Sequence, residues 1–174
     1  DLVLGKLAGR AALVCGALFG AMVVAGALVV YPFGTLTPLR FGAFVLLTLV
    51  FGLVWTGLGV AASVAASTRR RALAVAFGAF LLFVMGWGPV TDAVAFVLRE
   101  LGVVGADLPG PVRFAFELEP GAAFRRVTAG FVDPGASVTG PWYLGEWVAL
   151  VLLVLWAVLP VGLAYRRFAG RDLA

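Results

Sequence analysis

The stretch FGAFVLLTLVFGLVWTGLGVAASVAAST, residues 41–68, decides the fold, because it runs for 28 residues without a charged side chain. About 20 apolar residues, each rising about 1.5 Å, cross a bilayer core of about 30 Å, so this stretch predicts a transmembrane helix. The whole chain agrees, since 63% of its 174 residues are hydrophobic and 13% are charged, against roughly 45–50% and about 25% in soluble domains. A soluble core of this size cannot bury such an excess.

Three further apolar runs have the same character, and they cover residues 11–31, 72–91 and 142–165, the last with Glu146 as its one charged residue. Their apolar residues are continuous rather than alternating, which indicates helices and not the strands of a membrane barrel. We therefore predict an all-α integral membrane protein, a bundle of four transmembrane helices in a single domain, residues 1–174. The predicted spans are residues 11–31, 41–66, 72–91 and 142–165, with an outer segment at residues 92–141.

Basic residues gather on one side of this predicted bundle. If the spans alternate in direction, one side holds eight of the 13 lysines and arginines, namely Lys6, Arg10, Arg69, Arg70, Arg71, Arg166, Arg167 and Arg171. The positive-inside rule assigns this side to the cytoplasm, so we expect a multi-pass protein of the cell membrane with both ends of the chain cytoplasmic. Aromatic residues that favour the headgroup level lie at the opposite ends of the spans: Tyr31, Trp87, Trp142, Tyr143 and Trp147.

The outer segment, residues 92–141, is too long and too apolar for a simple loop. Residues 93–104 have the pattern of a helix that extends the third span or dips back into the membrane, and residues 112–119 alternate apolar and polar side chains. Residues 121–131 place three apolar side chains on one helical face and two arginines elsewhere: Phe124, Val127, Phe131, Arg125 and Arg126. We expect short interfacial helices in this segment.

Reactive side chains are scarce. The chain has no histidine and a single cysteine, Cys15, which excludes histidine-dependent catalytic triads, histidine-bearing zinc or haem sites and a disulfide scaffold. A Walker A motif is also absent, because Lys6 is followed by Leu7 and not by Ser or Thr. We expect no catalytic, cofactor-binding or metal-binding residues. We also expect no nucleic-acid partner, because the basic residues lie at the ends of apolar runs and not on a solvated face.

Several residues within the spans have two interpretations each. Gly16 and Gly20 form a GxxxG pair, whose spacing lets two helices approach closely, either across a subunit interface or within one subunit. Glu146 lies near the predicted outer interface, and it is interpreted either as an interfacial carboxylate or as part of an ion path. Trp55 and Trp156 lie near mid-span, where packing or lipid contact competes with a substrate contact.

Four stretches together carry a family resemblance: LGKLAGR at residues 4–10, TRRRALA at 68–74, ELEPGAAFRRV at 117–127, and PWYLGEWVALVLLVLWAVLPVGLAYRRFAGRDLA at 141–174. In this order they resemble four parts of ABC-2 type transporter permeases, especially of the NosY-like haloarchaeal branch. These parts are the cytoplasmic start of the third helix, the turn between the fourth and fifth helices, an outer Asn-Pro segment, and the final helix with its tail. One departure is Glu119, where the family has Asn.

This resemblance covers the chain as the latter two-thirds of a six-helix permease. Since the sequence also opens on Asp1 rather than Met, we expect a fragment that lacks the first two helices. The resemblance implies a permease subunit of an ABC transporter that pairs with a second permease copy. It also implies that separate ATP-binding cassette subunits hydrolyse the ATP, so that this chain is not itself an enzyme.

In such permeases the stretch before the third helix and the turn between the fourth and fifth helices dock on the ATPase. Carried over to this sequence, the docking residues are Lys6, Arg10, Arg69, Arg70 and Arg71. ATP hydrolysis would rock the helices between inward-open and outward-open states, with export as the expected direction. Two alternatives stay open. The arginine run could serve only to set the topology and to meet anionic lipid headgroups, and the chain could be a membrane-embedded scaffold or assembly factor without transport activity.

Overall fold

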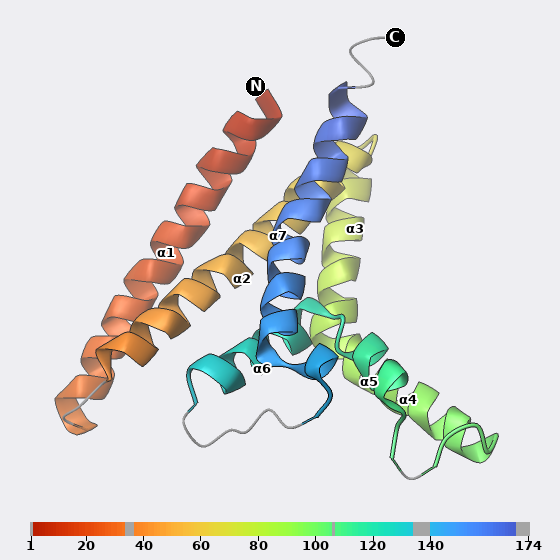
Figure 1. Ribbon diagram of the computed structural model, residues 1–174. Helices are drawn as coiled ribbons and strands as arrows, with labels where there is room; N and C mark the ends of the chain where they lie inside the picture. The colour runs from red at the N-terminus through yellow and green to blue at the C-terminus, as the bar shows by residue number, and fades with distance from the viewer. Residues whose placement is uncertain (1, 34–36, 106, 134–139, 170–174) are drawn as a thin grey trace.

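The computed structural model describes residues 2–33, 37–105, 107–133 and 140–169, and within these ranges the chain forms helices and turns and no strand (Figure 1). The helices, in order, are α1 (Leu2–Phe33), α2 (Pro38–Ala65), α3 (Arg69–Phe80), the π-helical η1 (Leu81–Gly86), α4 (Trp87–Glu100), α5 (Gly110–Phe116), α6 (Pro120–Phe131), the 3₁₀ turn η2 (Trp142–Leu144) and α7 (Glu146–Ala169).

Four of the described helical stretches are long and apolar enough to cross a membrane: Ala8–Val30, Pro38–Ala65, Arg69–Glu100 and Glu146–Arg166. The predicted all-α membrane class is therefore confirmed. Two local signals in the sequence account for helix starts. Pro38 occupies the first turn of α2, where its missing N–H costs nothing, and the Thr68 hydroxyl accepts a hydrogen bond from Arg71 N at the start of α3.

The third helical stretch differs most from the sequence-based bounds of 72–91. Without a break it runs through α3, η1 and α4, a total of 32 residues, which corresponds to about 48 Å and exceeds a bilayer core. The π-helical turn η1 interrupts its regular hydrogen bonding, and Pro89 follows three residues later without an N–H to donate. These two features explain why α4 turns away from the direction of α3 (Figure 1).

The three basic segments of the sequence lie at one end of the molecule. The start of α1, the turn between α2 and α3, and the end of α7 are together at the top of Figure 1. The link between α1 and α2 and the helices α4, α5 and α6 lie toward the opposite end. The described helices therefore alternate in direction, as the charge pattern requires.

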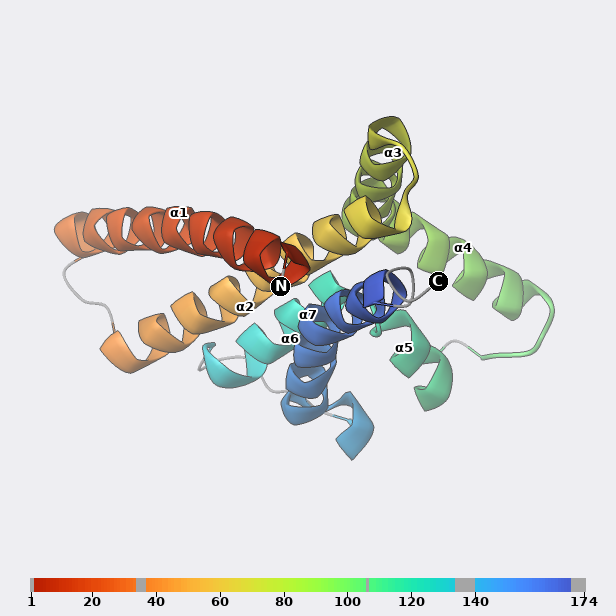
Figure 2. The ribbon, with the colours of Figure 1, turned by 90° about the horizontal axis from the view of Figure 1, so that it is seen from above.

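Helix α2 is the centre of the packing, with α1 on one side and α6 and α7 on the other (Figure 2). Side chains of α2, α6 and α7 form the core: Leu47, Val54, Val127, Ala149 and Leu153. Very few of the side chains of α1 and α3 are buried in the chain, so both helices present long apolar surfaces outward. In a membrane protein such surfaces face lipid or another chain.

Candidate functional site

The outer segment forms a pair of short helices, α5 and α6, as the sequence predicted. The apolar face predicted for α6 is the face that packs: Val127 is fully buried, Phe124 and Phe131 contact the core, and the rings of Phe124 and Phe51 stack with their centroids 4.6 Å apart. The alternating residues 112–119 do not form a strand, because Gly110–Phe116 is helical. These contacts fix α6 against the middle of α2.

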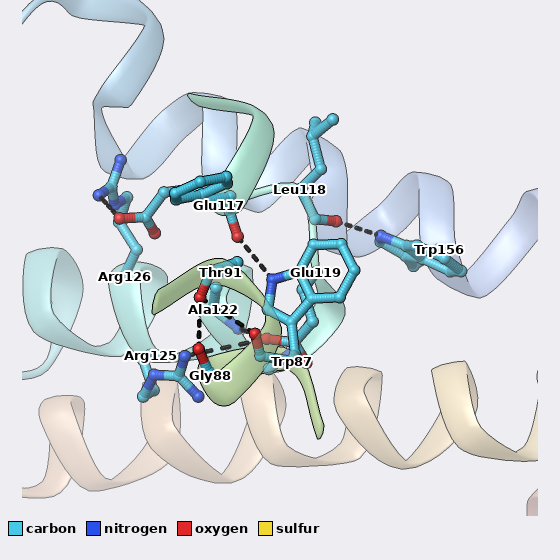
Figure 3. A network of polar contacts seen from close by, with 12 residues as sticks. Trp87, Gly88, Thr91, Glu117, Leu118, Glu119, Ala122, Arg125, Arg126 and Trp156 are labelled. Atoms are coloured by element: carbon cyan, nitrogen blue, oxygen red, sulfur yellow. Dashed lines mark hydrogen bonds and ion pairs between the residues drawn. The ribbon is translucent and has the colours of Figure 1, made fainter. Parts of the chain in front are cut away.

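Two tryptophans donate hydrogen bonds to the end of α5 and to the link that follows it (Figure 3). Trp87 Nε1 donates to the carbonyl of Phe116 at 2.8 Å, and Trp156 Nε1 donates to the carbonyl of Leu118 at 2.7 Å. Trp156 lies ten residues beyond Glu146, the first residue of α7, and this distance is about 15 Å along the helix. The link is therefore joined to the middle of α7 by the side chain of Trp156, and both indole N–H groups are used within the chain.

Glu119 caps the helix that follows this link. Its side chain is only 3% exposed, and its two carboxylate oxygens accept hydrogen bonds from Gly121 N and Ala122 N, each at 2.6 Å. Pro120, which has no N–H, occupies the first helical position. An acid at a helix N-terminus satisfies free backbone donors and the positive end of the helix dipole. Glu119 thus performs the capping function that Asn usually performs.

A partly buried ion pair ties α6 to both of its neighbours in sequence. Arg126 Nη2 contacts Glu117 Oε1 at 2.5 Å, and its Nη1 donates to the carbonyl of Leu144 at 2.7 Å. The Arg126 side chain is 13% exposed, whereas that of Arg125 is 73% exposed and lies 3.8 Å from Glu119 Oε2. The sequence placed both arginines away from the apolar face of α6, and the structure separates them, because Glu117 and the Leu144 carbonyl hold Arg126 in a partly buried position.

A charged cavity of about 680 Å³ lies beside this network. One wall comes from η1 and the start of α4, and it includes Phe83, Val84, Met85 and Trp87. The other wall comes from α5 and α6 and carries the charged residues Arg113, Glu117, Glu119, Arg125 and Arg126. Nothing in the sequence pattern joins these walls, since they are separated by some thirty residues. The local signal available in the sequence is Glu119 directly before Pro120, because an acid at the N-cap followed by proline is typical of a helix start.

The residues predicted to dock an ATPase lie at the other end of the molecule. Arg10, Arg69, Arg70 and Arg71 are exposed there, and Arg71 Nη1 donates to Ser67 Oγ at 3.1 Å. The position of Lys6 is helical, but its side chain lies outside the described residues, as does that of Tyr31. Arg10 also lines a small apolar space with Trp55 and Gly59. The structure thus puts the described members at one end, on two separate elements.

Gly16 and Gly20 have no packing partner within the described residues. A methyl group added to either would meet nothing within 4 Å, so the GxxxG pair does not serve α1–α2 packing. Two other glycines do allow close packing, and sequence reasoning missed them. A Cβ on Gly52 would come 2.5 Å from Leu18 of α1, and one on Gly57 would come 3.1 Å from Val161 and 3.3 Å from the Ala157 carbonyl of α7.

Glu146 and Trp55, which the sequence analysis also singled out, make contacts that account for them structurally. Glu146 is the first residue of α7 and is half-buried, a position in which a carboxylate complements the helix dipole. Trp55 makes edge contacts with Phe51 and Phe80. The described part of the chain contains no group of three or more histidine, cysteine or acidic residues that could hold a metal ion.

Comparison with known proteins identifies the family of the chain and gives no individual relative. No curated protein and no solved structure matches the chain. The family model described as "ABC-2 family transporter protein" matches residues 1–173, nearly the whole chain. With four helices able to cross a membrane, the chain belongs to the ABC-2 family of transporter proteins and is a multi-pass membrane permease component.

Proposed function

We propose that this chain is the subunit of an ABC transporter through which ATP hydrolysis by a separate cassette subunit drives a substrate across the membrane, in the direction of export. Two such chains, or this chain and a related one, would form the pathway. The observation that carries the proposal is the family match over residues 1–173, combined with the exposed basic residues at one end of the helices.

The proposed docking surface consists of Lys6, Arg10, Arg69, Arg70 and Arg71. The start of α1 and the turn before α3 are helix ends, and a force applied to a helix end moves the whole helix as a rigid element. Helix α2 leads directly into the basic turn and packs on α1, α6 and α7. Movement of that turn would therefore reach the short helices at the other end through α2.

A second permease copy is proposed to cover part of the exposed surface of α1. Gly16 and Gly20 lie on that surface with no neighbour among the described residues. In lipid, small residues at this spacing favour close helix contact between chains. The proposal assigns the cytoplasmic side to the basic end, in accordance with the positive-inside rule.

The decisive experiment is reconstitution with a cassette ATPase. The tagged protein would be purified from its native membranes, the co-purifying ATP-binding cassette protein identified, and the two combined in lipid vesicles. We expect ATP hydrolysis that is stimulated by the permease and lost with the variant Arg69→Glu/Arg70→Glu. The matched control, Arg40→Glu/Arg99→Glu, reverses two exposed arginines at the opposite end and should hydrolyse ATP normally.

Two outcomes would overturn the proposal. If no cassette protein accompanies the chain and none alters ATP hydrolysis, a membrane-embedded scaffold or assembly factor becomes the better explanation. If both double variants lose the ATPase equally, the basic turn is not the docking surface.

A further inference from the structure

We propose that the cavity between η1 and the helices α5 and α6 binds the headgroup of an anionic, phosphate-bearing amphiphile. This inference rests on the proposed function in one respect only, namely that the amphiphile is the class of substrate the permease moves. The binding site itself is argued from the described residues. Three features of the cavity support it, namely the contacts of each charged group, the position of the arginines beside a span-length helix, and the apolar facing wall.

The acidic groups of the cavity are already satisfied. Glu117 pairs with Arg126, and the carboxylate of Glu119 accepts two backbone hydrogen bonds at 2.6 Å. Neither acid therefore needs a ligand, and a bound cation would have to displace protein contacts. The acids leave no net negative charge to attract a basic substrate, because three arginines line the same cavity.

Two of the arginines retain unused donors. Arg125 is 73% exposed and reaches Glu119 only at 3.8 Å, while both oxygens of that acid are bonded to the backbone. Arg113 is exposed and, among the described residues, forms no ion pair and no side-chain hydrogen bond. A guanidinium group presents five N–H donors, and a phosphate has several oxygens that accept from such groups, so the two arginines that line this cavity favour a phosphate as the ligand.

The position of these arginines explains why an anion would stabilise them. Arg113 and Arg125 line the cavity together with Val84 and Met85, which belong to the helical stretch Arg69–Glu100 that is long and apolar enough to cross a membrane. A charged side chain within the membrane is costly and is usually paired or hydrated. A phosphate in the cavity would supply counter-charge to these two arginines.

The facing wall indicates that the ligand carries an apolar part. Val84 and Met85 line the cavity and are 55% and 67% exposed, and the exposed apolar surface continues along α3 through Phe80 and Phe77. The polar donors on this wall already have acceptors within the protein. Trp87 Nε1 donates to the carbonyl of Phe116, and the Thr91 hydroxyl donates to the carbonyls of Trp87 and Gly88. The site therefore selects negative charge together with an acyl-like tail and does not read headgroup identity.

Binding can be measured without nucleotide and without an ATPase subunit. The probe is fluorescently labelled phosphatidylglycerol, titrated with the purified protein in a neutral detergent. We expect Arg113→Gln/Arg125→Gln to raise the Kd by about tenfold or more. The matched pair Arg40→Gln/Arg99→Gln removes two exposed arginines outside the cavity and should bind as the unmodified protein does.

Competitors distinguish the source of the anion. Unlabelled phosphatidylglycerol should displace the probe, whereas phosphatidylcholine and inorganic phosphate at the same concentration should not. The single variant Arg125→Gln, which alters a largely exposed side chain and leaves the fold intact, should raise the Kd by about threefold. An unchanged Kd in the double variant would overturn the proposal, and so would displacement by inorganic phosphate, which would indicate a site for small soluble anions. Because the ATPase test does not use this probe, failure of either proposal leaves the other standing.

Discussion

Trp156 Nε1 lies 2.7 Å from the carbonyl oxygen of Leu118 and donates a hydrogen bond to it. This contact joins the middle of α7 to the link between α5 and α6, 38 residues earlier in the chain. A backbone carbonyl outside a helix needs a donor, and the indole supplies one without adding charge. Trp87, which donates a similar hydrogen bond to the carbonyl of Phe116, also lines the charged cavity.

The variant Trp156→Phe should lower the free energy of unfolding by about 0.5–1.5 kcal/mol, because the Leu118 carbonyl loses its donor while an aromatic ring is kept. Denaturation in detergent micelles, followed by circular dichroism, measures this change. The control is Trp142→Phe, at a side chain that is 81% exposed and whose indole makes no hydrogen bond with the described residues. Equal stability of the two variants would show that the hydrogen bond to Leu118 does not hold the link.

Gly57 permits the close contact of α2 with α7. The variant Gly57→Val should destabilise the protein by about 1–3 kcal/mol, because its side chain meets the Ala157 carbonyl, which cannot rotate away. Gly16→Val serves as the control, since a side chain there meets nothing within 4 Å in the described chain. Thermal unfolding in detergent should separate the two variants. Gly16→Val should instead lower the proportion of dimer seen by light scattering, and a normal dimer would contradict the proposed role of the GxxxG pair.

Glu119→Asn tests whether capping is the role of the acid at this position. Asn is among the best N-cap residues, so this variant should stay within about 1 kcal/mol of the unmodified protein. Glu119→Leu leaves Gly121 N and Ala122 N without acceptors in a buried place and should cost about 2 kcal/mol or more. Chemical denaturation of the three proteins measures the differences. If Glu119→Asn were as damaging as Glu119→Leu, the negative charge and not the cap would be the essential property.

The orientation in the membrane can be tested by cysteine labelling in a Cys15→Ala background. A membrane-impermeant maleimide should label Asp107→Cys on intact cells and should label Ser67→Cys only after lysis. Both side chains are exposed. Ser67 belongs to the turn between α2 and α3 and Asp107 to the link between α4 and α5, and Figure 1 shows these two connections at opposite ends of the helices. Labelling of Ser67→Cys from outside would reverse the proposed topology.

The sequence by itself determined the membrane class, the number of long helices and the apolar face of α6. Each of these follows from a local property, namely run length, charge at the ends of runs, or a helical repeat of side chains. Local chemistry also accounts for the starts of α2 and α3, through Pro38 in the first turn and the Thr68 cap. The third helix runs past its predicted span of 72–91 because that span was ended at the first charge, Asp92, while the helix continues to Glu100, as the pattern of residues 93–104 also allowed.

The tertiary structure decided which residues meet. Gly16 and Gly20 have the spacing of a packing motif, yet Gly52 and Gly57 are the glycines at helix contacts, because α2 crosses both of its neighbours there. Arg125 and Arg126 are adjacent in sequence, yet one is exposed and the other is paired beneath the surface. The charged cavity arises because two indoles hold the α5–α6 link against the spans, and hydrogen bonds between distant segments leave no periodic trace in a sequence.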